Sequence, residues 1–414
     1  MSGCGDAIAR DLAQQVARRS YGKLVAFLAV RTGDVSAAED ALSEAFAAAL
    51  ADWPRNGCPE NPEAWLMTVA RRKFLDSVRS HAREFPADEV AETTAAIEAG
   101  FDAEAIPDRR LGLMFACAHP AIDAAVRAPL MLQAILGLDA ARIASAFLVS
   151  PATMSQRLVR AKNKIRQAGI PLAIPERSEL PPRLDTILSA IYAAFAEGWI
   201  DAAGTDVARR DLAEEAIYLG RLVTELLPNE PEGLGLLALM LHAEARRRAR
   251  RTTDGEYVPL ARQDPSSWDA DMIAEAESLL HRAGTMNGLG RYQLEAAIQS
   301  AHAVRARTGK SDWSAIVQLY DALLALSGSP VAAVNRALAV AELYGPHQAL
   351  EELNRIAGDP RLVEYQPYWA ARADLLARTH AREEALHAYS IAIGLERDPS
   401  VRRFLEQRRK LVDE

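Results

Sequence analysis

The sequence has few cysteines, and those present are far apart. Cys4, Cys58 and Cys117 form no CxxC pair, and the histidines form no cluster. This spacing argues against a disulfide scaffold and against the usual zinc-binding arrangements. Isolated thiols of this kind are typically buried or inert. We therefore expect neither a metal site nor any other cofactor.

Long apolar runs are also absent. No stretch reaches the roughly 18 apolar residues that a membrane-spanning helix needs. The N-terminus, MSGCGDAIARDLAQQ, has no basic start followed by an apolar run, so it does not look like a signal peptide. These absences predict a cytoplasmic protein with no membrane partner.

Enzyme signatures are missing as well. The chain contains no GxxxxGK[ST], GxSxG or HExxH motif, and no compact group of carboxylates or of Cys and His residues. Such patterns provide phosphate-binding loops, serine nucleophiles and catalytic zinc. We therefore do not expect this chain to be an enzyme.

What is present favours helices. Half of the 414 residues are apolar, aromatic residues make up 6%, and alanine and leucine alternate with charged residues. That mixture predicts an all-α fold. At about 150 residues per domain, the length predicts two or three domains.

Charge is distributed unevenly along the chain. The formal net charge is −8, yet two short segments are basic. The first basic segment, 71–83, has five bases against Asp76, and the second basic segment, 139–169, has six bases against Asp139. Between them, from Glu84 to Asp108, there are eight acids, no bases and only weak periodicity. This intervening segment is typical of an acidic linker.

The first 84 residues predict three helices. One covers 6–31, and a second, amphipathic helix begins at Val35 and stops at Trp53-Pro54. The polar face of the second helix is formed by Glu39, Asp40, Ser43 and Glu44. After a proline-rich loop, Asn61 is placed to cap a third helix, which carries the first basic segment.

The second basic segment has the pattern of a helix, a turn and another helix. Ser150 and Pro151 predict the start of the latter helix. Its apolar face is formed by Met154, Leu158, Ala161 and Ile165. A neighbouring polar face is formed by Thr153, Arg157, Arg160 and Lys164, with Gln156 at its edge. An apolar stripe beside a basic stripe is typical of a helix that contacts DNA phosphates and base edges.

An internal repeat is visible near the C-terminus. The segments NRALAVAELYGPHQAL (335–350) and ARADLLARTHAREEAL (371–386) align at an offset of 36 residues. The matched pairs are Arg336/Arg372, Ala337/Ala373, Ala349/Ala385 and Leu350/Leu386. A period near 34 with alanine at close-packing positions indicates paired-helix repeats of tetratricopeptide type. We expect such repeats to provide a binding surface.

Together these segments resemble a known family. The stretches AEDALSEAFAAALADWP and NPEAWLMTVARRKFLDSVRSHAR look like region 2 of bacterial RNA polymerase sigma factors of the extracytoplasmic-function type. The stretch APLMLQAILGLDAARIASAFLVSPATMSQRLVRAKNKI looks like sigma region 4. The tail, including EAIYLGRLVTELLPNEPEGLGLLALMLHAEARRRAR, resembles the sigma group with a C-terminal tetratricopeptide-like extension.

The resemblance implies a domain order and a role for each domain. Region 2 would occupy 1–84, the acidic linker 85–108, a helix-turn-helix region 4 109–170, and the helical, TPR-like extension 171–414. The chain would bind core RNA polymerase and direct it to promoter DNA. The extension would regulate the sigma part in cis and could bind a protein partner or a ligand.

The resemblance also implies roles for individual residues. Docking on core RNA polymerase is implied for Asp40 and Glu44. Melting and reading of the −10 promoter element is implied for Arg71, Arg72, Lys73, Asp76, Arg79 and Arg83. Contact with the −35 element is implied for Thr153, Ser155, Gln156, Arg157 and Arg160, with Lys162, Lys164 and Arg166 on phosphates.

The sequence departs from the family pattern at several positions. Arg72 replaces the usual asparagine of region 2, and Leu148 replaces the usual turn glycine of the helix-turn-helix. Arg142 replaces the usual acidic residue, and Pro265 replaces the usual arginine in the extension. The promoter sequence is therefore not predicted.

Other functions stay open at this point. A helix-turn-helix regulator with a partner-binding or ligand-binding repeat domain would never join the polymerase. A scaffold with a decayed DNA-binding part would not bind duplex DNA at low salt.

Simpler roles are also open for several side chains. Asp40 and Glu44 can be ordinary surface charges. Trp53 and Trp65 can be core residues instead of platforms for exposed bases. The arginines of RRRARR (246–251) can satisfy carbonyls at the end of a helix.

Overall fold

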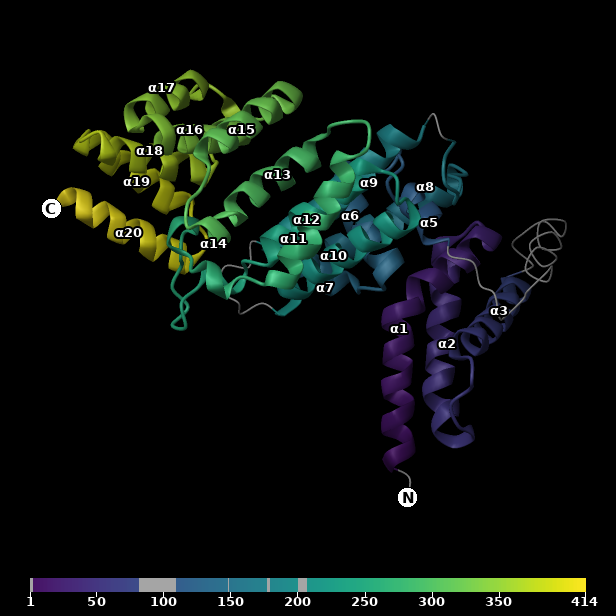
Figure 1. The fold of residues 1–414 in the computed structure, drawn as a ribbon. Coiled ribbons are helices and arrows are strands. Elements are labelled where there is room, and N and C mark those ends of the chain that lie inside the picture. The colour runs from purple at the N-terminus through teal and green to yellow at the C-terminus, as the bar shows by residue number, and fades with distance from the viewer. Residues whose placement is uncertain (1–2, 82–108, 148, 177–178, 200–206) are drawn as a thin grey trace. The chain divides into compact units, whose positions relative to one another are not determined.

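The computed structural model describes residues 3–81, 109–147, 149–176, 179–199 and 207–414 (Figure 1). Within these ranges the chain is helical, with one isolated antiparallel bridge between Arg251 and Tyr257 and no strand. The all-α prediction is confirmed. In the same ranges, no helix has both the length and the apolar character needed to cross a membrane. The acidic linker, 85–108, and Arg83 lie outside the described residues.

Two compact units make up the chain. The first is Met1–Gly198 together with Asp211–Glu215, and the second is Trp199–Arg210 together with Ala216–Glu414. The first unit contains both basic segments, and the second contains the predicted repeat.

The first unit begins with three helices that pack against one another. They are α1 (Gly3–Thr32), α2 (Val35–Asn56) and α3 (Pro62–His81). Asp34 caps α2 by accepting a hydrogen bond from the Ala37 amide at 3.2 Å. Asn61 caps α3 in the same way, from the Ala64 amide at 3.0 Å. The predicted cap of α3 is therefore confirmed.

Helix α2 ends later than the sequence predicts. It continues through Pro54 to Asn56 and stops at Gly57, whose φ of 91° favours glycine. Pro54 has no amide hydrogen to donate to the Leu50 carbonyl. Because Pro54 lies in the last turn, the helix loses this one hydrogen bond close to its end.

Five more helices lie in the described residues of the first unit up to Gly198. They are α5 (Arg110–Cys117), α6 (Ala124–Leu136), α7 (Ala140–Ala146), α8 (Pro151–Gln167) and α9 (Leu180–Trp199). Asp123 caps α6 through the Ala125 amide at 2.9 Å, and Gly137 ends it in the left-handed conformation with φ 68°. The first unit reaches Gly198, so α9 packs with it up to that residue.

The contact between α1 and α6 joins the first three helices of this unit to the helices that follow residue 109. Gly22 of α1 lies so close to the Ile135 carbonyl that a β-carbon at position 22 would overlap that oxygen. Beside this contact, the Tyr21 ring lies against Gly137. Helix α5 also packs against α1. A close backbone approach of this kind requires glycine at position 22.

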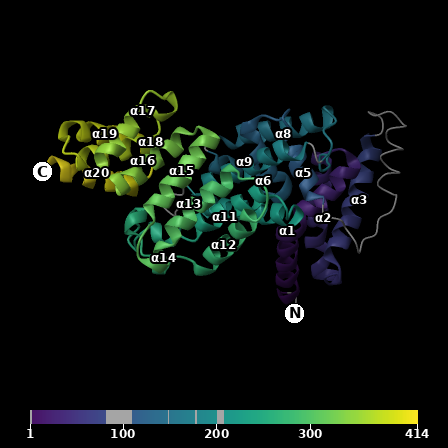
Figure 2. The same ribbon diagram turned by 45° about the horizontal axis from the view of Figure 1, so that its top comes forward.

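The second unit is a stack of helices in which neighbours along the chain are neighbours in space (Figure 2). It includes Trp199 and all of α10 (Val207–Leu226) except Asp211–Glu215. The next helices are α11 (Pro231–Glu244), η1 (Arg248–Arg250), η2 (Leu260–Arg262), η3 (Pro265–Ser267), α12 (Ala270–Gly284), α13 (Arg291–Ala303) and α14 (Arg305–Thr308). The last are α15 (Trp313–Ser327), α16 (Pro330–Tyr344), α17 (Pro346–Ile356), η4 (Pro360–Leu362), α18 (Gln366–Arg378), α19 (Arg382–Leu395) and α20 (Pro399–Asp413).

The predicted repeat corresponds to two helical pairs, α16 with α17 and α18 with α19. Four matched alanines have 0% exposure: Ala337, Ala349, Ala373 and Ala385. A methyl side chain at these positions lets the paired helices approach closely. The repeat therefore marks equivalent packing contacts in successive pairs.

The arginines of the RRRARR segment contact their own unit. Arg246 donates to the His242 carbonyl at 3.2 Å, one turn earlier in the chain. Arg250 donates to the Trp199 carbonyl at 3.0 Å, and its guanidinium lies 4.3 Å from the centre of the Trp199 ring. These contacts agree with a structural role for the segment.

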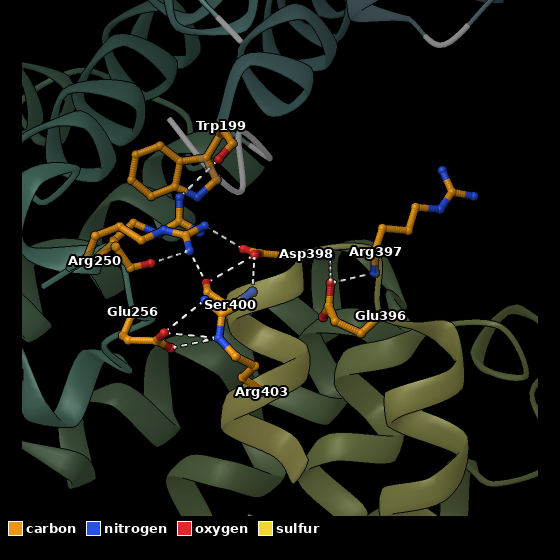
Figure 3. Close-up of polar contacts among 10 residues, drawn as sticks. Trp199, Arg250, Glu256, Glu396, Arg397, Asp398, Ser400 and Arg403 are labelled. Atoms are coloured by element: carbon orange, nitrogen blue, oxygen red, sulfur yellow. Dashed lines mark hydrogen bonds and ion pairs between the residues drawn. The ribbon is translucent and has the colours of Figure 1, made fainter. Parts of the chain in front are cut away.

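The next arginine, Arg251, ties the loop before η2 to the start of α20, where Figure 3 labels its partners Asp398 and Ser400. Arg251 pairs with Asp398 at 2.5 Å and donates to the Ser400 hydroxyl. Asp398 in turn accepts from the Ser400 amide at 2.8 Å and so caps α20. Glu256 and Arg403 form a second ion pair at 2.9 Å. The C-terminal helix is thereby fixed within its unit.

Candidate nucleic-acid interface

Helix α8 has one buried and one exposed face, as the sequence predicts. Ser150 caps the helix by accepting from the Thr153 amide at 3.2 Å, and Pro151 is its first residue. The buried residues are Met154, Leu158, Ala161 and Ile165. The exposed residues include Thr153, Ser155, Gln156, Arg157, Arg160 and Lys164. This face presents hydrogen-bonding and cationic groups to solvent.

A short helix supports α8. Helix α7 packs against α8, and its Ile143 and Ala144 are buried. Asp139 caps it by accepting from the Arg142 amide at 2.8 Å. The two helices are separated by four residues, of which Leu148 lies outside the described residues.

Two basic residues of α8 point away from this exposed face. Lys162 forms an ion pair with Glu39 of α2, and the two side chains are only 9% and 11% exposed. Arg166 forms a second ion pair, with Asp34 at 2.9 Å. Lys162 and Arg166, both expected on DNA phosphates, are therefore engaged within the first unit.

The Glu39 carboxylate lies in an apolar, enclosed environment. Burial raises its pKa above the usual range, and the neighbouring Lys162 partly offsets that shift. Among the described residues, its Oε1 has no hydrogen-bond partner. Burial, with the Glu39 charge nearby, also raises the pKa of the Cys117 thiol and of Tyr21. One buried ion pair thus lies where α1, α2, α5 and α8 meet.

The first basic segment lies on α3. Arg72, Lys73 and Asp76 are exposed, whereas Arg71 is half-buried. Lys73 pairs with Glu44 of α2 at 3.1 Å, which joins a residue expected at the −10 element to one expected on the polymerase. Arg79 lies within α3, but its side chain is outside the described part of the structure.

The structure adds two arginines to this basic surface. Burial lowers the pKa of Arg31, and the cations Arg71 and Arg109 lower it further. The Arg31 guanidinium also lies 4.4 Å from the centre of the Phe27 ring. The sequence pattern had no signal for this group, because its members come from α1, from α3 and from the residue before α5.

The two tryptophans of this part contact each other. Trp53 is 2% exposed, so it belongs to the core. Trp65 is half-buried, and the two ring centres are 5.6 Å apart in an edge-to-face arrangement with an interplanar angle of 69°. Trp65 is the member of the pair that keeps some solvent access.

An acidic surface lies on α2. Asp40 and Glu44 are exposed one helical turn apart, and Leu50 on the same helix is 49% exposed. Glu39 precedes Asp40 in the sequence, but its side chain is buried and does not belong to this acidic surface.

No metal centre is found in the part of the chain that the structure describes, where no group of three His, Cys, Asp or Glu residues could hold an ion. Cys58 is exposed and Cys117 is buried, and both are free. The side chain of Cys4 lies outside the described residues.

Comparisons with known proteins match two parts of the chain to families and most of the chain to one relative. Residues 7–84, which contain most of α1 together with α2 and α3, match sigma-70 region 2. Residues 183–284 match a family of unknown function, DUF6596. An uncharacterized protein of Rhizobium meliloti (strain 1021) is 38% identical over 364 residues, which cover 86% of this chain and 86% of the relative. No solved structure matches.

Proposed function

Since the chain belongs to the family of the Rhizobium meliloti protein and carries a sigma-70 region 2 at its N-terminus, we propose that it is an RNA polymerase sigma factor. It is of the extracytoplasmic-function type and has a tetratricopeptide-like extension. The chain binds core RNA polymerase in the cytoplasm and directs it to a restricted set of promoters. The match of residues 7–84 carries the proposal.

Helix α8 contacts the −35 element in this proposal. Its exposed face combines Gln156 and Arg157, which can reach base edges, with Arg160 and Lys164, which can hold phosphates. Ser150 and Pro151 fix the start of the helix, where a recognition helix contacts bases. Helices α7 and α8 then act as a helix-turn-helix.

Helix α3 contacts the −10 element. Arg72 and Lys73 are exposed for contacts with phosphates, together with Arg79 and Arg83. The cationic group that includes Arg31 and Arg71 adds to the attraction for the separated strand. Trp65 is the aromatic residue available for base stacking.

The acidic face of α2 docks on the polymerase through Asp40 and Glu44. Because Lys73 pairs with Glu44 at 3.1 Å, polymerase contact and contact with the −10 element influence each other. When Glu44 pairs with a basic residue of the polymerase instead of with Lys73, Lys73 becomes available for a phosphate.

The packed arrangement of the first unit has to open when both elements are bound. Positions −10 and −35 are about 25 base pairs apart, which is on the order of 80 Å at 3.4 Å per step. Helices α2 and α8 are instead joined by the ion pair between Glu39 and Lys162. Lys162 therefore becomes available to a phosphate only after α8 leaves α2. Regulation of this opening is the role we assign to the C-terminal extension.

Run-off transcription tests the proposal. Purified core polymerase is combined with the full-length chain on a pool of native promoter fragments, and discrete new start sites are expected. Replacing Arg157 and Arg160 together by Ala should lower these transcripts at least about tenfold, since one base contact contributes about 1–3 kcal/mol. Replacing the exposed Arg262 and Arg282 of the second unit together by Ala removes the same charge and serves as the matched control.

Other outcomes separate the alternatives. Absence of both new transcripts and co-elution with core polymerase contradicts the proposal and favours a regulator that acts without the polymerase. Co-elution without transcripts indicates an inhibited state. In that case a chain ending at Glu215, which removes most of the second unit, should gain transcription if the extension inhibits.

A further inference from the structure

The second unit contains a cavity of about 480 Å³. Helices α13, α15, α16 and α18, labelled in Figure 1, supply most of its walls. Its apolar side is formed by Trp313, Ile316 and Leu338. Cavities of this size, with apolar walls and a few polar groups, are typical of sites for small organic ligands.

Two arginines line the other side of the cavity. Arg246 donates to the Gln299 side chain and to the His242 carbonyl. Arg305 donates to the carbonyls of a single loop, those of Leu260, Ala261 and Gln263. Within the described residues, no carboxylate lies within ion-pair distance of Arg246 or Arg305. Both cations therefore rely on neutral acceptors alone.

The acids at the cavity have cations of their own. Glu342 pairs with Arg378 at 2.9 Å, and Asp374 pairs with Arg408 at 2.5 Å. Asp374 also lies 3.8 Å from Arg378. These carboxylates do not neutralise the side of the cavity where Arg246 and Arg305 lie.

The pKa values of two residues that line the cavity agree with an excess of positive charge there. Burial and the nearby Arg250 and Arg305 lower the pKa of Arg246 to about 10. Burial, together with Arg246 and Arg305, lowers the pKa of His302 to about 4, so this cavity residue is neutral near pH 7. Its ring lies 5.7 Å from that of Trp313. A partly desolvated cation without a carboxylate partner, as Arg246 is, is costly to the free protein, and a bound anion relieves that cost.

We propose that this cavity binds a small organic anion, with its carboxylate or phosphate group on Arg246 and its apolar body against Trp313 and Leu338. The planar guanidinium presents paired N–H donors that match either anionic group. The apolar wall contributes by removing the body of the ligand from water. The cavity residues belong to the second unit, whereas the residues proposed to bind DNA and polymerase belong to the first, and the test of this site does not depend on the proposed function.

Calorimetric titration of the full-length chain tests the site. Three probes share one ring system: 1-naphthylacetate, 1-naphthyl phosphate and the neutral 1-naphthylacetamide. We expect saturable binding of at least one anion at one site per chain, at least tenfold tighter than binding of the amide. The two anions distinguish carboxylate recognition from phosphate recognition.

Substitutions locate the binding to this cavity. Arg246→Gln should weaken binding of the anion at least tenfold and leave binding of the amide nearly unchanged. Arg282→Gln removes an exposed positive charge from α12 in the same unit, and it should leave binding of both probes unchanged. Asn335→Asp keeps both arginines but adds a negative charge to the cavity lining, so it should weaken anion binding as well.

Three outcomes would overturn the inference. They are the absence of saturable binding by either anion, equal affinity for anion and amide, and unchanged anion binding by Arg246→Gln. Where Arg246→Gln does not fold, as judged by circular dichroism, the Asn335→Asp variant decides.

Discussion

Lys162 and Glu39 share one buried site, and each is the other's counter-ion. Their side chains are 9% and 11% exposed, so neither charge is well hydrated when its partner is removed. A buried pair of this kind is not necessarily better than two apolar residues, but removing one member leaves an uncompensated charge. The pair therefore makes the first unit sensitive to a single substitution on α8.

We expect Lys162→Met to lower the free energy of unfolding by about 3 kcal/mol near pH 8. Burial already raises the pKa of Glu39, and loss of Lys162 raises it further. A carboxyl whose pKa is higher in the folded state stabilises the fold below its unfolded pKa, and this contribution is lost as the pH rises through the folded value. The deficit of the variant should thus be smaller at pH 5 than at pH 8. Urea denaturation followed by circular dichroism measures both values.

Lys164→Met is the matched control for that experiment. Lys164 is exposed on the same helix, so the change should alter stability by less than about 0.5 kcal/mol at either pH. Equal effects of the two substitutions would show that the buried pair has no special importance.

Local residue patterns were readable from the sequence, and distant pairings were not. The side chains of Asn61 and Ser150 each cap a helix by accepting from the amide three residues later in the chain. Their role therefore depends only on residues nearby in the sequence. The family resemblance implied a DNA phosphate as the partner of Lys162, yet its partner in the fold is Glu39, which is 123 residues away. Arg246 lies in a run of similar residues, and only the fold places it at a cavity without a carboxylate partner.

At the scale of elements, the contact between α1 and α6 depends on glycine. We expect Gly22→Ala to destabilise the first unit by about 1–3 kcal/mol, because the new β-carbon would overlap the Ile135 carbonyl and backbone atoms cannot move aside easily. Thermal unfolding of the full-length chain, followed by circular dichroism, should show a lower transition temperature for the first unit.

Gly394→Ala is the control for this change. Gly394 lies within α19 and has open space where a β-carbon would be added. Helix propensity alone then favours alanine by up to about 1 kcal/mol, so the transition temperature should stay the same or rise. A similar rise for Gly22→Ala would mean that α1 and α6 do not approach closely in solution.

Composition and periodicity predicted that the chain is helical and the approximate order of several helices, but not which helices pack together in each unit. Equivalent buried alanines marked α16 to α19 as repeated pairs. The first unit extends to Gly198 because α9 contacts it. These contacts join residues far apart in the chain, so a local sequence pattern could not predict this boundary. The end of α2 beyond Pro54 shows that a proline in the last turn need not end a helix.

At the scale of the whole molecule, total charge opposes DNA binding. The chain carries −8, so attraction to a phosphate backbone has to come from the local surfaces of α3 and α8. For DNA binding, the position of a positive charge on the surface should therefore matter more than its contribution to the net charge.

Two triple variants separate position from total charge. Changing Arg157, Arg160 and Lys164 to Gln shifts the net charge from −8 to −11, as does changing the exposed Arg262, Arg282 and Arg397 to Gln. The first set should strongly weaken binding to a nonspecific duplex at low salt, leaving only the attraction of α3, whereas the second should leave binding nearly unchanged. Fluorescence anisotropy over a salt series measures both, and equal losses would assign the attraction to total charge.

The ion pair between Glu39 and Lys162 also has a kinetic consequence. Under the proposed function, only molecules in which α8 has already left α2 can engage both promoter elements. If those molecules are a small fraction of the population, association slows by that fraction, and the apparent affinity falls by the same factor. Dissociation of a complex already formed does not pass through the paired state. The buried pair would therefore act on how quickly a promoter is found, and a complex would last equally long with or without it.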